Sequence, residues 1–115
     1  MNRFLKIVFM LYCCSVTLLS GARPTNVIGF DDMSCGAWAA SEATPLHRDT
    51  YVFWIRGFLS GHNYANQAHQ TPVVSNSTIV LYVDKYCKEN PLNQFAGAAF
   101  KLSDELAQRS RPLNE

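Results

Sequence analysis

Hydrophobic residues recur at intervals of three and four along most of this chain, and polar stretches separate the repeats. The spacing predicts four helices, over residues 35–43, 46–64, 75 or 77 to 89, and 91–108. Each predicted helix carries one continuous apolar face, which is the pattern of a helix packed against a core. The chain is therefore expected to be all-α, with one short and three longer helices in a compact four-helix domain.

Capping residues indicate where these helices begin. Ser34 precedes the first helix as an N-cap, and Ser75 or Ser77 opens the third. Asn90 and Pro91 predict the start of the fourth helix, because proline suits a first turn, where its missing N–H is no loss. The segment between the second and third helices is polar and reads as a surface loop.

The residues on these apolar faces are expected to form the core. They comprise Cys35, Trp38 and Ala39 in the first helix; Tyr51, Trp54, Ile55, Phe58, Leu59 and His62 in the second; Ile79, Tyr82, Val83, Tyr86 and Cys87 in the third; and Leu92, Phe95, Ala96, Ala99, Leu102 and Leu106 in the fourth. On the outside of the third helix, Asp84 and Lys88 lie one turn apart and are expected to pair.

Two glycines stand four residues apart inside the second helix. Gly57 and Gly61 each cost the helix up to about 1 kcal/mol relative to alanine. Their shared face therefore predicts a close backbone approach by another element. Trp38, Trp54 and Phe58 are expected to take part in the same helix packing.

The chain has more aromatic residues than a four-helix core of this size requires. Simple core filling is one explanation, favoured for Trp54 and Phe58. Tyr51, Phe53 and Tyr82 are the better candidates for exposure. Exposed aromatics often mark partner contacts, here a client-binding or a homodimer face.

The first 22 residues have the pattern of a signal peptide. Arg3 and Lys6 precede an apolar run over 7–19, and small residues at 20–22 suit cleavage before residue 23. A retained membrane anchor is the alternative, but an apolar run of 13 residues is shorter than the ~20 needed to span a bilayer. The chain is expected to be exported, to the periplasm or beyond the cell.

Removal of that segment leaves a single small domain. Of the 115 residues, 93 remain, with eight basic and nine acidic side chains and a formal charge of −1. Residues 23–33 form an extended, loosely held lead-in, 34–108 the helical domain, and 109–115 a disordered tail. A chain so near neutrality has no electrostatic footprint for nucleic acid or anionic lipid.

Two cysteines remain after cleavage, since Cys13 and Cys14 leave with the signal peptide. Cys35 and Cys87 are expected to form a disulfide, because an exported chain meets an oxidising compartment. A redox or metal site is the alternative, but the two thiols lack a Cys-x-x-Cys spacing.

Candidate catalytic chemistry is sparse. His47, His62 and His69 lack metal-ligand spacing with one another or with carboxylates. Ser60 stands near two glycines but lacks the Gly-x-Ser-x-Gly nucleophile elbow. No catalytic, cofactor-binding or metal-binding residue is predicted, and the chain is expected not to be an enzyme.

Four blocks together resemble a known layout. They are Cys35-x-x-Trp38, the run from Trp54 to Asn63, the run from Val83 to Pro91, and an alanine-rich helix ending at Leu106. The chain resembles the HdeA-like family of small periplasmic proteins, and the layout is also similar to the Tai immunity-protein family. The resemblance implies four helices, one disulfide between the matching cysteines, and no catalytic residues or cofactor. The block from Trp54 to Asn63 departs from the acid chaperone HdeA itself.

Three functions remain open from the sequence. The first is protein–protein contact in the periplasm, of an HdeA-like, stress- or acid-chaperone type. The second is a Tai-like immunity protein that inhibits a secreted cell-wall amidase. The third is an envelope-associated helper without a soluble client. The chain is expected to act by contact with a protein partner or client of unknown identity, and a homodimer is the default for such folds. Neither nucleic acid nor stable membrane insertion is expected.

Overall fold

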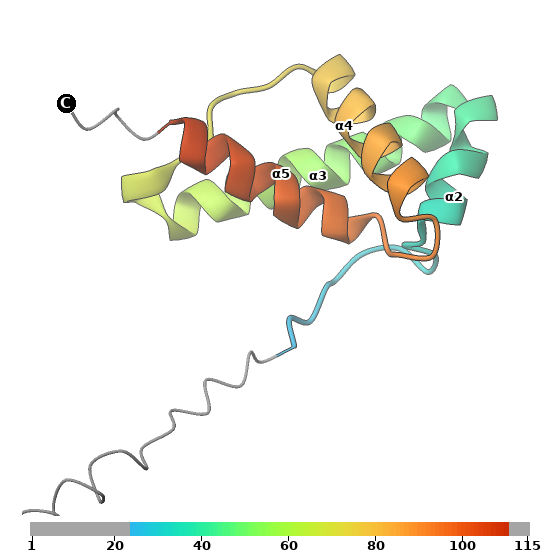
Figure 1. The fold of residues 1–115 in the computed structure, drawn as a ribbon, viewed down its shortest axis with the longest axis horizontal. Helices are drawn as coiled ribbons and strands as arrows, with labels where there is room; N and C mark the ends of the chain where they lie inside the picture. Colours follow the sequence, from blue (N-terminus) through green and yellow to red (C-terminus); the bar gives the residue numbers. More distant parts are fainter. Residues whose placement is uncertain (1–23, 111–115) are drawn as a thin grey trace, which may run out of the picture.

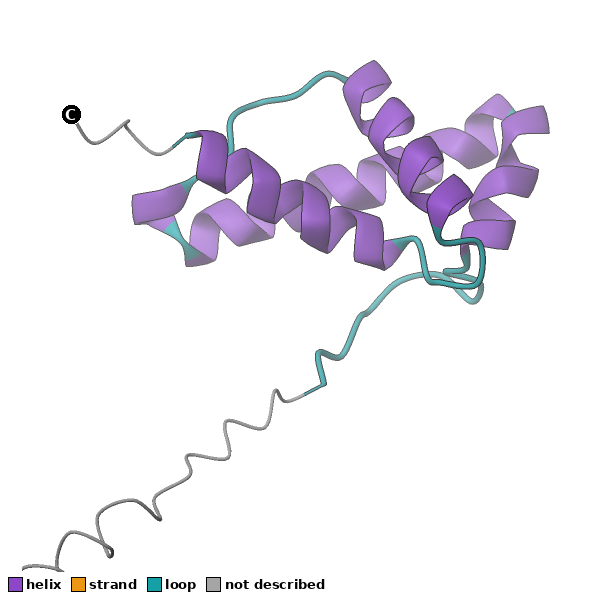
Figure 2. Ribbon diagram, viewed as in Figure 1, coloured by secondary structure: helices purple, strands orange, loops and turns teal. Residues whose placement is uncertain are grey.

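The computed structural model describes residues 24–110. Within this range the chain forms helices and loops without strands, as Figure 2 shows, and this confirms the all-α prediction. The helices are α2 (Cys35–Ala40), α3 (Pro45–Ala65), α4 (Asn76–Glu89) and α5 (Ala96–Arg109), with short 3-10 turns at Ser41–Ala43 and Gln67–His69. The predicted signal peptide and most of the predicted tail lie outside the described residues.

The longest helix, α3, organises the domain. Figure 1 shows α5 lying along α3, with α4 and the short α2 packed at one end of this pair. The side chains between the helices form one core, built mainly from the predicted apolar faces. Its fully buried members include Trp38, Val52, Ile55, Ile79, Val83, Phe95 and Ala99.

The helix starts follow the capping residues found in the sequence. Ser34 Oγ accepts a hydrogen bond from the backbone N–H of Ala37 at 3.0 Å. Ser75 Oγ accepts one from Thr78 at 3.1 Å, which places the start of α4 after Ser75 rather than Ser77. Pro45 occupies the first turn of α3, where its missing N–H leaves no hydrogen bond unmade.

Cys35 and Cys87 form the predicted disulfide, with their Cα atoms 5.1 Å apart. Both cysteines are buried, at the start of α2 and near the end of α4. The bond therefore ties the first described helix to the third.

The predicted start of the fourth helix is wrong. Instead of a helix from Pro91, the chain makes a turn over 91–95, and α5 begins at Ala96. The turn is held by the start of α2: the N–H of Cys35 donates to the carbonyl O of Asn93 at 2.9 Å, and the N–H of Phe95 donates to that of Met33 at 2.8 Å. These tertiary hydrogen bonds override the local preference for a helix.

The prediction for Leu92 is wrong for the same reason. It was expected on a buried helix face, but it lies in the turn and is 98% exposed. Phe95, three residues later, is fully buried as predicted.

The lead-in is less loose than predicted. Residues 24–33 have no regular secondary structure, yet Val27, Phe30 and Met33 pack against the core. The ring of Phe30 lies 5.0 Å from that of Tyr51 and 6.2 Å from that of Phe95. The lead-in is therefore part of the domain, and it places Ile28 beside α3.

Candidate protein-contact surfaces

An apolar groove of about 460 Å³ opens between the lead-in, α3 and α5. Its walls are Thr25, Asn26, Val27, Ile28, Trp54, Gly57, Phe58 and Phe100, which include no charged side chain. Trp54 Nε1 donates to the carbonyl O of Ile28 at 2.9 Å, so the lead-in is fixed as one wall. We call this site the lead-in groove.

Aromatic packing shapes the floor of the lead-in groove. Trp54 and Phe58 lie one turn apart on α3, with nearly parallel rings 5.9 Å apart. Phe58 in turn meets Phe100 of α5 at 5.3 Å. These rings also pack on the core, which confirms the predicted packing role of Trp54 and Phe58 while leaving part of each facing the groove.

Next to the groove, and sharing Gly57 with it, four uncharged residues of α3 face solvent. Phe53 is 64% and Tyr64 84% exposed, and Gly57 and Gly61 lie between them on the same side of the helix. We call Phe53, Gly57, Gly61 and Tyr64 the α3 outer face.

The prediction that Gly57 and Gly61 allow another element of the chain to approach closely is wrong for the described residues. A Cβ atom built on either glycine has no heavy atom beyond its own helix and chain neighbours within 4 Å. The two glycines instead leave a shallow gap along the helix, next to the exposed ring of Phe53.

The three aromatics expected at a partner contact differ in exposure. Phe53 is exposed as predicted. Tyr51 is not: it is 2% exposed, and its ring packs against Trp38, Phe30 and Phe95 in the core. Burial, with the nearby charge of Asp32, raises the pKa of Tyr51 above its ordinary value.

Tyr82 is half-buried between α4 and α5. Its hydroxyl donates to Glu105 Oε1 at 2.7 Å. Burial and the hydrogen bond to the Glu105 carboxylate both raise the pKa of Tyr82 well above its ordinary value. The residue links two helices, so only part of its ring remains for any external contact.

A polar network next to the disulfide was missed by sequence reasoning. Asp84 Oδ1 accepts one hydrogen bond from Trp38 Nε1 at 2.7 Å and one from Arg48 at 2.9 Å. The guanidinium of Arg48 also lies 3.9 Å above the Trp38 ring and donates to the Trp38 carbonyl O at 3.2 Å. The predicted partner of Asp84 was Lys88; its partner is Arg48, so the carboxylate joins three helices.

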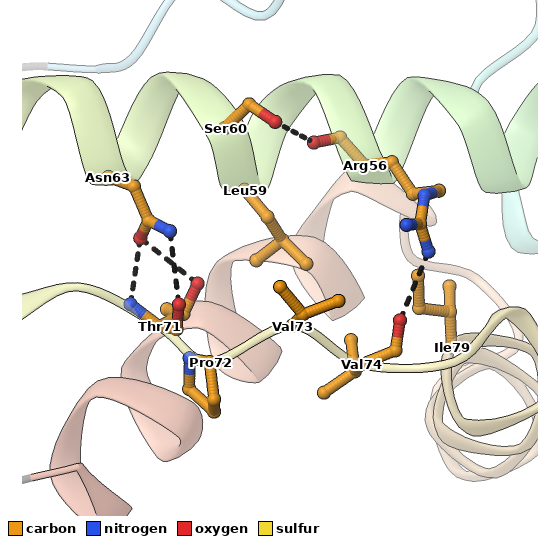
Figure 3. Close-up of a pocket in the computed structure, with 9 residues that line it drawn as sticks. All are labelled: Arg56, Leu59, Ser60, Asn63, Thr71, Pro72, Val73, Val74 and Ile79. Atoms are coloured by element: carbon orange, nitrogen blue, oxygen red, sulfur yellow. Dashed lines mark hydrogen bonds between the residues drawn. The ribbon is translucent and has the colours of Figure 1, made fainter.

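The loop after α3 is fastened to that helix. Asn63 Oδ1 accepts from the N–H and the hydroxyl of Thr71, at 2.7 and 3.0 Å, and its Nδ2 donates to the Thr71 carbonyl O at 3.0 Å. Figure 3 shows these bonds beside a small cavity of about 100 Å³. At its other end, Arg56 donates to the carbonyl O of Val74 at 3.0 Å. We call Asn63 and Thr71 the loop clamp.

The residues considered for catalysis do not converge. Ser60 Oγ donates to the carbonyl O of Arg56 in its own helix at 2.9 Å. Within residues 24–110, no three His, Cys, Asp or Glu side chains gather in a way that would hold a metal ion.

No protein-family model matches the chain, and neither the curated proteins nor the solved structures contain a match. Among the described helices, none is both long and apolar enough to cross a membrane. We therefore base the functional proposal on the surfaces described above.

Sequence signals existed for part of these surfaces. The uncharged run of exposed positions on α3 follows a helical period and includes Phe53, which the sequence singled out. The lead-in groove had no such signal, because Ile28 and Phe100 are 72 positions apart and meet Trp54 only through the fold.

Proposed function

We propose that the chain is an exported, non-enzymatic protein that acts by binding other proteins. The observation that carries this proposal is the lead-in groove, an open apolar depression of about 460 Å³ without a charged wall residue. Exposed apolar depressions on small proteins commonly mark binding sites, because their area is removed from water only when a partner covers it. The N-terminal apolar run and the disulfide support export to an oxidising compartment.

We propose further that this binding is of the chaperone type, in the periplasm. The groove is open and lined by aromatic rings, which suits short apolar segments of varied sequence better than one exact shape. The sequence resemblance to HdeA-like proteins, which implies four helices and one disulfide, motivates this proposal. We propose that acid is the trigger, since protonation of the carboxylates leaves the chain strongly positive.

An aggregation assay tests this proposal. The purified protein, without its first 22 residues, is mixed with an acid-denatured model client at about pH 3 and at neutral pH, and light scattering is followed. We expect the protein to suppress scattering, most strongly in acid. Failure to suppress scattering at either pH, together with no binding of an apolar dye in acid, would contradict the chaperone proposal.

Two matched variants connect the activity to the groove. Ile28→Lys places a charge on the groove wall that persists in acid, at a side chain that is 89% exposed and therefore tolerant of substitution. Leu92→Lys adds the same charge at a side chain of the turn that is also highly exposed, outside the groove. Suppression should be lost in the first variant and kept in the second. Recovery of one tight, stoichiometric partner from the periplasm, in place of many clients, would favour a Tai-like inhibitor.

A further inference from the structure

We propose that the lead-in groove binds the C-terminal end of an apolar polypeptide. The bound segment lies antiparallel beside residues 25–28, with its terminal carboxylate at the N-terminus of the mature chain. The inference deepens the proposed function and rests on it, since it needs a groove that binds protein segments and cleavage of the signal peptide before Arg23.

The floor of the groove favours apolar side chains. Trp54, Phe58 and Phe100 remain partly exposed there, and no charged side chain lines the walls. A charge carried onto these rings would lose its water without gaining a partner, which costs free energy. Any charge on the bound segment therefore belongs at an end of the groove.

The lead-in wall offers main-chain hydrogen bonds to a bound segment. Among the described residues, the backbone groups of Thr25, Asn26 and Val27 make no hydrogen bond to another main-chain group. Figure 1 shows this part of the lead-in drawn out rather than coiled. A drawn-out segment with free main-chain groups can pair with a second extended chain. Four extended residues span roughly 13 Å, so about four residues of the bound segment fit beside it.

The charge at one end of the groove is positive. Cleavage before Arg23 leaves a free α-amino group and a guanidinium two positions before Thr25, which lines the groove. Two positions of chain span at most about 8 Å, and both groups are mostly protonated at neutral pH. The acids of the lead-in, Asp31 and Asp32, line a different depression beyond Phe30. The lead-in therefore brings cations, and no acid, to this end of the groove.

These features together select a chain terminus and an orientation. Antiparallel pairing places the last residue of the bound segment beside the first residues of the lead-in, so its carboxylate meets the two cations. The residues before it then cover the aromatic floor. A parallel segment would bring its N-terminal side to the same cations. A terminal carboxylate is also fixed to the main chain, whereas an acidic side chain loses rotamer freedom when it is held in place.

Fluorescence anisotropy at about pH 7 is the first test, with the purified mature chain, whose cleavage site is checked by intact mass. The probes are two labelled peptides of the sequence Gly-Ser-Gly-Leu-Val-Phe, one with a free C-terminus and one amidated. The free acid should bind about fivefold more tightly. An amidated peptide extended by one glutamate should bind like the plain amide. Equal binding of acid and amide, or full recovery by the glutamate, would overturn the inference.

Matched substitutions test the role of the cations. Arg23→Gln in a chain acetylated at its N-terminus removes both positive charges and should abolish the preference for the free acid. Lys85→Gln with a free N-terminus removes one charge from an exposed position of α4, which provides no wall of the groove, and should keep the preference. Arg23→Gln alone should reduce it. An equal reduction by Arg23→Gln and Lys85→Gln would assign the effect to net charge and contradict the inference.

Ile28→Lys separates this inference from the proposed function. It should abolish binding of the amidated peptide, whose contact with the groove is apolar, because it places a charge on the wall. If it does so while the native chain binds acid and amide equally, groove binding stands and the carboxylate preference is wrong. If the native chain binds neither peptide at up to about 1 mM, both proposals are wrong.

Disulfide trapping tests the orientation. Thr25→Cys should cross-link fastest to a peptide with cysteine next to its free C-terminus, and Ile28→Cys to one with cysteine three residues earlier. Lys85→Cys, exposed on α4, measures random collision and should favour neither peptide. The opposite preference at Thr25→Cys and Ile28→Cys would show a parallel segment and overturn the arrangement.

Discussion

The indole Nε1 of Trp38 and the carboxylate Oδ1 of Asp84 lie 2.7 Å apart, joined by a hydrogen bond between α2 and α4. The same oxygen accepts from Arg48 of α3 at 2.9 Å, and the side chain of Arg48 is 12% exposed. One half-exposed acid thus satisfies donors from two other helices, close to the disulfide that joins α2 to α4.

Removal of this acid should destabilise the domain. Asp84→Ala leaves the Trp38 indole without its acceptor and leaves the largely buried guanidinium of Arg48 with the Trp38 carbonyl O alone, and we expect the free energy of unfolding to fall by about 1–3 kcal/mol. Asp84→Asn keeps one acceptor oxygen and should cost less. Urea unfolding followed by tryptophan fluorescence measures both. Asp31→Ala, at an exposed acid of the lead-in, is the control and should change stability by less than about 0.5 kcal/mol; an equal loss in the control would contradict the role given to Asp84.

The disulfide should contribute a large part of the stability. Cys35 and Cys87 close a loop of 52 positions, which on the chain-entropy model corresponds to roughly 4 kcal/mol. Reduction, or the double substitution Cys35→Ser and Cys87→Ser, should lower the urea midpoint accordingly. Mass spectrometry with and without reductant confirms the bond in the starting sample. A midpoint that reduction does not move would mean that the cross-link constrains little of the unfolded chain.

Two glycines in helices should respond oppositely to the same substitution. Gly57 is open to solvent, so Gly57→Ala should raise the free energy of unfolding by up to about 1 kcal/mol. A Cβ at Gly97 would collide with the hydroxyl of Tyr86, which is buried and accepts from Asn93. Gly97→Ala should therefore lower it by about 1–3 kcal/mol. Thermal melts of dilute samples compare the two, and a shift of the same sign in both would contradict the packing described at Gly97.

Tyr82 should make the domain sensitive to alkali. Burial and Glu105 raise its pKa in the folded state, so the unfolded chain loses this proton first as the pH rises past about 10. The folded state then holds more protons than the unfolded state, and stability falls with further rise in pH. Tyr82→Phe should flatten this decline between about pH 10 and 12, while Tyr64→Phe, at an exposed tyrosine, should not. Urea midpoints across this range give the comparison.

The four helices were predictable because each depends on its own sequence. The apolar spacing is a local signal that predicted α3 to within a residue at each end, and the capping serines are local signals that predicted the starts of α2 and α4. The disulfide followed from compartment and cysteine count. Each of these features is decided by residues near in sequence or by elimination.

The errors lie where tertiary contacts compete with local preference. Asn90 and Pro91 favour a helix start, but the turn after them bonds to the residues around Cys35. Lys88 was the nearest partner for Asp84 along the helix, yet Arg48 reaches Asp84 from α3, with its guanidinium lying over the Trp38 ring. The turn and the ion pair both depend on how the helices pack against one another, and a single sequence does not show this packing.

The wrong predictions for Tyr51 and Gly57 have the same cause. Helical spacing tells which residues share a face but not which face the lead-in covers. Phe30 lies over Tyr51 and buries it, whereas nothing in the described chain covers Gly57. The sequence therefore predicted only part of the candidate surfaces, namely the exposed ring of Phe53.

The position of Phe30 has a consequence for the order of folding. Its ring is enclosed by Tyr51, from the middle of the chain, and by Phe95, from near the end. A chain from which Phe95 has not yet emerged cannot complete this aromatic cluster, even when its N-terminal helices have formed. The N-terminal residues must wait for the C-terminal ones, so a chain that emerges N-terminus first leaves these rings exposed to any binding protein until residue 95 has followed.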